Sequence, residues 1–254
     1  MKIDVILSPA ELPTLARRDL SATTCVVFDV LRATSTFVTA LQNGAKEIIP
    51  VSEISEALDF KKSEVGSRKS EVVLLAGERY GVRISAGGVD FDLGNSPREY
   101  TPDKVRGKTI VSTTTNGTRA LRACLGAKTV LAASFLNLTA TLEFLRRNRF
   151  ENVLLVCAGT GENPASEDII AAGALADALV PGKDTFSKRT ESAVAARNAY
   201  FEAMRMGLEW KISVSENARC LLSMPELRDD VAFCLQHDIF PLVARMENGV
   251  IRKV

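Results

Sequence analysis

The sequence of 254 residues is poor in the residues that several common active sites need. It has one histidine, His237, in a polar stretch near its end. A histidine phosphatase or a Ser-His-Asp hydrolase needs a histidine base that the fold positions, and we expect His237 to be a surface or structural residue instead. The five cysteines are scattered without a Cys-x-x-Cys pair, which argues against a zinc site. We interpret them as reduced core residues.

Several motifs of phosphate chemistry are also missing. No GxxxxGK[ST] occurs, so the chain is not a P-loop NTPase. Gly159 and Gly161 lack the third glycine of a dinucleotide-binding loop. A Cys-x5-Arg phosphatase loop from Cys157 would need arginine where Asn163 stands. An aspartyl-phosphate motif of the Asp-x-Asp type would need aspartate at Leu31.

The chain has no strong net charge and no long apolar run. Its 32 Lys and Arg residues nearly balance 31 Asp and Glu residues, so it lacks the basic surface that nucleic acids or anionic membranes attract. No apolar run reaches the ~20 residues that cross a bilayer, and the first residues have the pattern of a strand, not of a signal peptide. We therefore expect a cytoplasmic protein with neither nucleic-acid nor membrane partners.

Short apolar runs rich in Val and Ile alternate with helical patterns. The runs predict strands that are covered on both faces, over residues 2–7, 25–29, 47–51, 72–76, 109–112, 129–133 and 153–157. Helices are predicted over residues 33–42, 54–62, 119–125, 139–147 and 169–179. This alternation indicates an α/β fold, a largely parallel mixed sheet flanked by helices. We expect one domain over residues 1–254, and a weak internal similarity suggests strand-helix halves near 1–105 and 106–254.

Two regions interrupt the alternation. Residues 77–105 are rich in Gly, Pro and Asp, which predicts either a functional loop or a small excursion with its own strands. After Pro181, helices are predicted over 191–206, 215–222 and 225–236. Asn248-Gly249 then separates two apolar runs at 240–246 and 250–254, which is a strong hairpin signal.

Polar loops follow the predicted strands, and an open α/β sheet gathers such loops at the carboxyl ends of its strands, where ligands bind. Asp29 ends the first such strand beside Arg32, a position that favours a functional carboxylate over a plain helix N-cap. Glu78 and Arg79 follow the strand at 72–76, where a surface ion pair is the alternative.

Two further acidic pairs occur along the chain. Asp90 and Asp92 flank one residue of an extended segment, so they point the same way and could hold a hard cation. Turn formation explains them equally well. Glu167 and Asp168 open the helix at 169–179, where acidic residues are favourable in any case.

Residues 113–119 are the best candidate for anion binding. Their hydroxyls, a flexible Asn116-Gly117 and Arg119 lead from a strand into a helix N-terminus. Free N–H groups at such a terminus attract phosphate-like groups, and arginine adds two-pronged recognition. An ordinary Ser/Thr cap is the alternative.

Taken together, the motifs resemble the 2-phosphosulfolactate phosphatase family of the ComB type. The resemblance rests on DVLRATST from Asp29, GER from Gly77, FDLGNSP from Phe91, TTNGTRA from Thr114, SFLN from Ser134, CAG from Cys157 and Glu167-Asp168 with Ala172-Gly173. It implies an α/β fold and an Mg²⁺-dependent phosphatase that hydrolyses (2R)-2-phospho-3-sulfolactate to 3-sulfolactate and phosphate, on the route to coenzyme M. A related small phosphorylated hydroxy acid is an alternative substrate.

On this reading the loops form one site. The predicted catalytic residues are Asp29, Arg32, Glu78 and Arg119. The predicted substrate-binding residues are Arg79, Asn95, Ser96, Thr114, Thr115, Asn116, Gly117, Thr118 and Asn137. The predicted Mg²⁺ ligands are Asp29, Asp92, Glu167 and Asp168.

The sequence leaves some points open. The partner we expect is a small anionic phosphorylated substrate, and a homodimer and a covalent phospho-enzyme at Asp29 both stay open. A non-catalytic binder of a phosphorylated or sulfonated metabolite is the main alternative. A structural α/β subunit is a third reading, and it would have these loops splayed apart.

Overall fold

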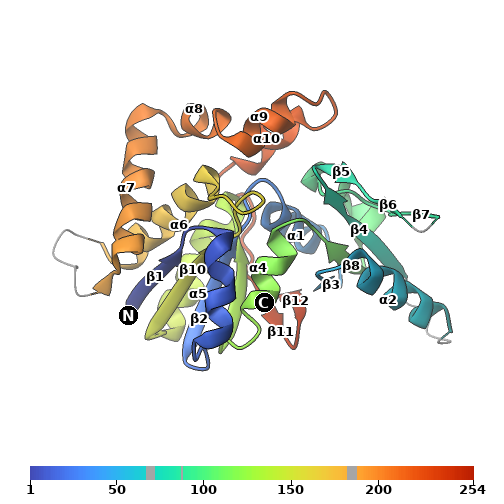
Figure 1. Cartoon of the computed structure of the whole chain (residues 1–254), viewed down its shortest axis with the longest axis horizontal. Coiled ribbons are helices and arrows are strands. Elements are labelled where there is room, and N and C mark those ends of the chain that lie inside the picture. Colours follow the sequence, from blue (N-terminus) through green and yellow to red (C-terminus); the bar gives the residue numbers. More distant parts are fainter. Residues whose placement is uncertain (67–71, 87, 182–187) are drawn as a thin grey trace.

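The computed structural model describes residues 1–66, 72–86, 88–181 and 188–254, in which strands and helices alternate (Figure 1). Its main sheet has the strand order β1-β10-β2-β9-β11-β12-β3-β8-β4-β5. The strands are β1 (Lys2–Ile6), β2 (Thr23–Phe28), β3 (Glu47–Pro50), β4 (Val73–Arg79), β5 (Val82–Arg83), β8 (Thr109–Thr113), β9 (Thr129–Ala133), β10 (Asn152–Cys157), β11 (Ala244–Glu247) and β12 (Val250–Lys253).

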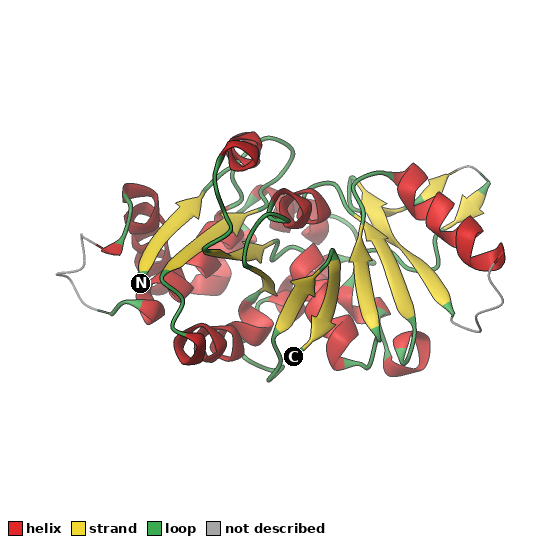
Figure 2. Cartoon of the chain, turned by 90° about the horizontal axis from the view of Figure 1, so that it is seen from below, coloured by secondary structure: helices red, strands yellow, loops and turns green. Residues whose placement is uncertain are grey.

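The sheet consists of two parallel groups joined by an antiparallel hairpin. We call β1, β10, β2 and β9 the first strand group, and β3, β8 and β4 the second strand group; within each, neighbours pair in parallel. The hairpin β11–β12 pairs antiparallel with β9 on one side and β3 on the other, and it carries the C-terminus between the groups (Figure 2). The predicted α/β fold with a largely parallel mixed sheet is therefore confirmed. Each group contains strands from before and after residue 105, so the two strand groups do not coincide with segments 1–105 and 106–254 of the sequence.

Helices cover both faces of the first strand group. Alternate residues of β2 point to opposite faces, as strand geometry requires: Val27 packs with the 3₁₀ helix η1 (Pro9–Arg17), α1 (Ala33–Gln42) and α4 (Gly117–Ala123). Phe28 instead packs with α5 (Leu138–Asn148) and α6 (Ser166–Leu179). This two-sided cover explains why the strands read as continuous apolar runs.

The second strand group has a smaller core of its own. Leu75 and Val111 pack on one face with α2 (Ile54–Gly66) and with Phe91. On the other face, Ala76 and Ile110 join the larger core beneath α1 and α4. The larger core therefore runs under both groups and fixes their carboxyl ends relative to each other.

The excursion after β4 has its own strands, as one of the two predictions stated. β4 does not end at residue 76; it continues through Glu78 and Arg79, which pair with β5 across a Tyr80-Gly81 turn. Gly77 has φ +147, and a Cβ there would collide with the carbonyl of Thr113, so this crossing point requires glycine. The small strands β6 (Ser85–Ala86) and β7 (Val89–Asp90), η2 (Pro97–Glu99) and α3 (Pro102–Val105) complete the segment.

The C-terminal helices lie along the left side and the top of the view in Figure 1. They are α7 (Glu191–Met206), α8 (Leu208–Ser213), α9 (Glu216–Leu222) and α10 (Arg228–Cys234). The predicted helix over 225–236 is thus shorter, and α8 was not foreseen. The predicted terminal hairpin is confirmed, and Arg252 of β12 ties it to Glu47 of β3 at 2.5 Å. Among the described residues, no helix is both long enough and apolar enough to cross a membrane.

Candidate functional site

A cavity of about 400 Å³ lies where β2, β4, β8 and β10 end, with α9 as a further wall. This is the edge of the sheet where an open α/β fold presents ligand-binding loops. The lining residues are Asp29, Leu31, Arg32, Glu78, Tyr80, Gly81, Asn95, Thr115, Asn116, Gly159, Thr160, Gly161, Asn163, Glu216, Asn217, Cys220 and Leu221. Six of the site residues predicted from the sequence therefore line this one cavity: Asp29, Arg32, Glu78, Asn95, Thr115 and Asn116.

Asp29 follows the last residue of β2, lies just before α1 and lines the cavity. Its Oδ1 accepts a hydrogen bond from the backbone N–H of Ala33 at 3.0 Å. A Cβ on Gly117 would stand 2.5 Å from its Oδ2, so only glycine lets the start of α4 approach this closely. Burial raises the pKa of Asp29 to about 7; the hydrogen bond opposes the rise, and the nearby charges of Glu78 and Glu167 add to it.

Glu167 and Asp168 lie buried next to Asp29 in the first turn of α6. Asp168 accepts from the N–H of Val30 at 2.8 Å and from that of Gly159 at 3.0 Å, so it ties the loop after β2 to the loop after β10. Burial raises the pKa of Asp168 well above its usual range, and Asp29 and Glu167 raise it further. Asp168 is therefore a brace with both oxygens engaged.

Glu167 is less well satisfied. One of its oxygens accepts from Nδ2 of Asn217 in α9 at 2.7 Å. Its Oε2 is buried and has no hydrogen-bond partner. Burial raises the pKa of Glu167, and hydrogen bonding by Asn217, by its own backbone N–H and by Ser215 and Ser166 only partly offsets this. Such an orphaned buried oxygen is costly unless something else binds it.

Glu78 has the opposite surroundings. Its Oε1 accepts from the N–H of Thr115 at 2.8 Å and from the Thr115 hydroxyl at 2.9 Å. Its Oε2 accepts from the N–H of Gly81 at 2.8 Å. Glu78 therefore links the β4–β5 turn to the loop after β8 and holds two walls of the cavity together.

Arg32 is the one cation among the described residues that line the cavity. It is 3% exposed. Its Nη1 donates to Oδ2 of Asp230 in α10 at 2.7 Å, and its Nη2 donates to the carbonyl of Gly81 at 3.0 Å. Ser96 donates to the other oxygen of Asp230 at 2.7 Å. Asp230 was not among the predicted site residues, because it lies 198 positions beyond Arg32 and belongs to no motif.

The loop after β8 uses its hydroxyls internally. Thr114 and Thr118 exchange hydrogen bonds between hydroxyl and backbone N–H, both at 3.1 Å, so the Thr114 hydroxyl satisfies one N–H in the first turn of α4. Asn116 donates to the carbonyls of Ala158 and Gly161 at 2.8 and 2.9 Å, joining the two strand groups at the cavity.

Arg119 does not reach the cavity. Its side chain is 53% exposed, and its nearest acidic group, on Glu162, is 3.9 Å away. Its position on the outer side of α4 does not favour the anion-clamp role that the sequence suggested.

Three other predicted residues make contacts elsewhere. Arg79 turns back along the sheet to donate to the Thr113 hydroxyl at 2.9 Å. Asp92 accepts from the N–H of Leu75 at 2.8 Å and pairs with Lys61. Asn137 is buried and donates to the Leu242 carbonyl at 3.2 Å.

Sequence reasoning missed the wall formed by α9. Glu216, Asn217, Cys220 and Leu221 line the cavity from this helix, and an amphipathic helix gives no sign of which ligand it faces. Cys220 is exposed, so the prediction that all the cysteines are core residues is wrong for this one. The other four are buried. His237 is exposed, as predicted, and its ring lies 5.0 Å from that of Phe135.

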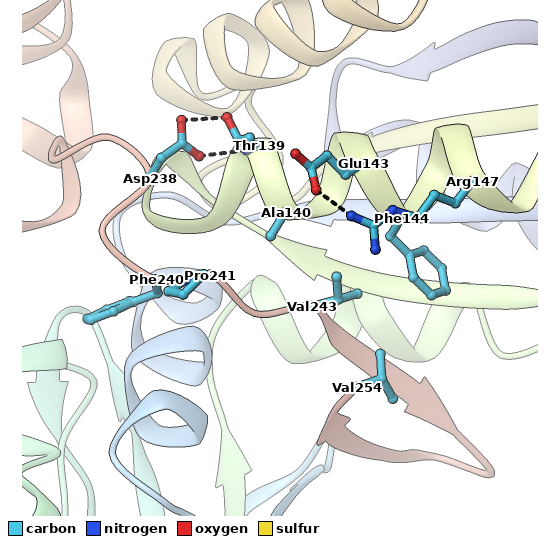
Figure 3. Close-up of a pocket in the computed structure, with 10 residues that line it drawn as sticks. All are labelled: Thr139, Ala140, Glu143, Phe144, Arg147, Asp238, Phe240, Pro241, Val243 and Val254. Atoms are coloured by element: carbon cyan, nitrogen blue, oxygen red, sulfur yellow. Dashed lines mark hydrogen bonds and ion pairs between the residues drawn. The ribbon is translucent and has the colours of Figure 1, made fainter.

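A second cavity of similar size, about 390 Å³, lies between α5 and the segment before β11 (Figure 3). Its charged groups are already paired: Asp238 accepts from Thr139, and Arg147 donates to Glu143 at 2.7 Å. Volume therefore does not separate the two cavities. Chemistry does, because the first alone combines buried carboxylates with a buried arginine.

Comparison with known proteins agrees with this choice. The family model for 2-phosphosulpholactate phosphatase matches residues 8–249. The chain is 42% identical over 250 residues to a probable 2-phosphosulfolactate phosphatase of Thermotoga petrophila. This match covers 98% of the chain and 96% of that protein. A probable 2-phosphosulfolactate phosphatase of Caldanaerobacter subterraneus is 39% identical, and the match covers 92% of this chain and 92% of that protein. Another, from Clostridium perfringens, is 37% identical, and the match covers 100% of this chain and 97% of that protein. The family resemblance seen in the motifs is confirmed: this chain belongs to the 2-phosphosulpholactate phosphatase family.

Proposed function

We propose that this protein hydrolyses (2R)-2-phospho-3-sulfolactate to 3-sulfolactate and phosphate in the cavity around Asp29 and Arg32, with Mg²⁺ as cofactor. Family membership supports the reaction class. The observation that supports a metal site is the Oε2 atom of Glu167, which is buried near Asp29 and has no hydrogen-bond partner. Two carboxylates in such surroundings favour a bound cation, because it would relieve both the burial cost and their mutual repulsion.

The donor set suits Mg²⁺ better than zinc. The described residues hold no cluster of three or more His, Cys, Asp or Glu side chains that could enclose a metal ion. Mg²⁺ is commonly held by one or two carboxylates, and water supplies the rest of its shell. We assign Asp29 and Glu167 as the residues that would hold it. When bound, Mg²⁺ supplies charge neutralisation and Lewis-acid polarisation at the phosphoryl group.

Neighbouring residues support these two. Asp168 keeps its place as the brace that holds Val30 and Gly159. Asp92 is an unfavourable ligand, because its Oδ2 already contacts the N–H of Leu75 and the amine of Lys61.

The chain's own residues would orient the substrate. Arg32 presents a guanidinium to the phosphoryl oxygens, and charge neutralisation and positioning supply most of the rate enhancement in phosphoryl transfer. Asn95, Thr160 and Asn163 line the same cavity and offer neutral hydrogen-bond donors to a second anionic end, such as the sulfonate. Leu31 and Leu221 add apolar wall that limits the access of water.

The test is phosphate release by the purified protein over a panel of phosphorylated hydroxy acids. The panel contains phosphosulfolactate, phospholactate without the sulfonate, and a generic aryl phosphate, each with added Mg²⁺ or with excess chelator. We expect release from phosphosulfolactate to be fastest, to stop with chelator and to return with Mg²⁺. Undiminished phosphate release in excess chelator would refute the proposed Mg²⁺ requirement. Ligand binding without any turnover would make the protein a binder of such metabolites.

A further inference from the structure

We infer that Asp230 is a positioning residue, which holds the guanidinium of Arg32 in the orientation that receives the substrate anion. Asp230 does not line the cavity itself. The inference rests on the proposed function in one respect, the role of Arg32 as the anion-binding cation. It brings α10, a helix far from every site motif, into the site.

The contacts of Asp230 all come from segments that build the cavity. Its side chain is 0% exposed. One carboxylate oxygen accepts from Arg32 at 2.7 Å, and the other accepts from the hydroxyl of Ser96 at 2.7 Å. Arg98 lies 3.6 Å from that second oxygen and is itself 40% exposed. Asp230 is thus the acceptor at which the loop after β2 and the loop before η2 meet.

These contacts fix the plane of the Arg32 side chain. A guanidinium is flat and rigid, with five N–H donors in fixed directions. Asp230 holds Nη1, and the Gly81 carbonyl holds Nη2 from another side. With two nitrogens held, the guanidinium cannot rotate, and its remaining N–H groups keep one orientation at the wall of the cavity. A preorganised donor of this kind needs no rearrangement when a charged substrate binds.

A purely stabilising role would not account for the arrangement. Buried ion pairs add little net stability compared with apolar residues of the same volume. This pair, however, places its positive end at the cavity wall and its negative end outside the lining. The neighbouring Asp229 offers the contrast, since it contacts Arg98 at 3.3 Å and its side chain is 64% exposed.

The experiment compares Asp230→Asn with the matched control Asp229→Asn, one position earlier in α10. Asparagine keeps the size of the side chain and removes its charge. We expect Asp230→Asn to raise KM for phosphosulfolactate about tenfold or more, and to weaken the binding of inorganic phosphate, measured by calorimetry, by a similar factor. Asp229→Asn should leave both within about twofold, as is usual for surface changes. Circular dichroism and thermal unfolding establish that each variant is folded.

A double-mutant cycle shows whether Asp230 acts through Arg32. In an Arg32→Lys background, Asp230→Asn should add less than about twofold to the loss of phosphate affinity, because the residue it positions is already gone. Full additivity would overturn the inference. Ser96→Ala, which removes only a neutral donor from Asp230, should raise KM by about threefold. It replaces Asp230→Asn in the comparison with wild type if that variant does not fold, and an unchanged KM then overturns the inference.

The two proposals fail in different ways. Wild-type protein that binds phosphate without turnover would refute hydrolysis, and a loss of that binding in Asp230→Asn would still support the positioning role. Active wild type with unchanged KM and phosphate affinity in a folded Asp230→Asn would refute the positioning role alone. Wild type that neither hydrolyses the panel nor binds phosphate would refute both.

Discussion

The two strand groups bring different kinds of side chain to the same cavity. The first strand group and the segments that follow it supply charge: Asp29 and Arg32 line the cavity after β2, and Glu167 with Asp168 lie buried beside Asp29 after β10. The second strand group supplies hydrogen-bonded framework, with Glu78 at the end of β4 and Asn116 after β8. The carboxylates of the first group crowd one another, whereas Glu78 of the second receives three donors.

This difference separates binding from support. A carboxylate whose oxygens are filled by backbone N–H groups has little capacity left for a ligand, so Glu78 acts as a tie between two walls. Glu167 keeps a buried oxygen without a partner, which is stable only if a ligand, ion or water completes it. On the proposed function, ligand binding is therefore concentrated in the segments that follow the first strand group, and Glu78 and Asn116 after the strands of the second hold the cavity walls together.

The largest effect should come from the charge at the end of β2. Asp29→Asn should lower kcat roughly 10²–10⁴-fold, because it removes either the proton acceptor or a metal contact at the reacting phosphoryl group. Asp92→Asn is the matched control, since Asp92 lies in the loop after β7, beside β4 of the second group, and contacts Leu75 and Lys61. Steady-state phosphate release measures both. A loss in Asp92→Asn as large as in Asp29→Asn would break the division between the two groups.

The sequence predicted the sheet and one edge of the site for the same physical reason. Strands buried on both faces read as continuous apolar runs, and parallel strands end at one edge. Asp29, Glu78 and Asn116 lie at the cavity on that account.

Side-chain direction could not be read in the same way. Arg79 points away because β4 continues three residues beyond its apolar run, to Arg79 itself. Asp92 turns to a backbone N–H that no pattern reveals. Asp230 reaches the site through tertiary folding of α10 alone, and it has no local signal at all.

The arginines give the next test of the comparison. Arg32→Ala should lower kcat/KM roughly 10–100-fold, because a charge-assisted contact with a phosphoryl group in a buried site is worth about 1.5–3 kcal/mol. Arg119→Ala should change it by less than about twofold, since that side chain is exposed and its nearest partner, Glu162, is 3.9 Å away. Steady-state kinetics measure kcat/KM for both variants, and thermal unfolding shows whether each variant is folded. Equal losses would restore Arg119 as an anion clamp.

A substitution at Glu167 should have a smaller effect, and this effect is on thermal stability. Glu167→Gln should raise the melting temperature of the metal-free protein by about 2–4 °C, because it replaces a buried, half-satisfied carboxylate by a neutral group that Asn217 can still contact. The same change should reduce the further rise on adding Mg²⁺. Thermal unfolding at neutral pH in chelator and in Mg²⁺ measures both. Glu162→Gln, at an exposed site, is the control and should change neither value. A lower melting temperature for Glu167→Gln would show that Glu167 is already satisfied as it stands.

The smallest effect concerns a carboxylate of the first strand group that does not line the cavity and is well satisfied. Asp4 of β1 accepts from Thr190 at 2.8 Å and from Arg18 at 2.9 Å. Burial alone would raise the pKa of Asp4, but these contacts, with those of Ser192 and the Val5 N–H, hold it below its ordinary value. A carboxylate with a lowered folded-state pKa stabilises the protein above its unfolded pKa, about 3.9, and loses that contribution as pH falls through the folded value. Asp4→Asn should therefore lower the melting temperature modestly at pH 6, and the gap to wild type should close as pH falls below about 4. A gap that widens on acidification would show that Asp4, like Glu167, is strained by its burial, and that the contrast between satisfied and unsatisfied carboxylates does not follow the distance from the cavity.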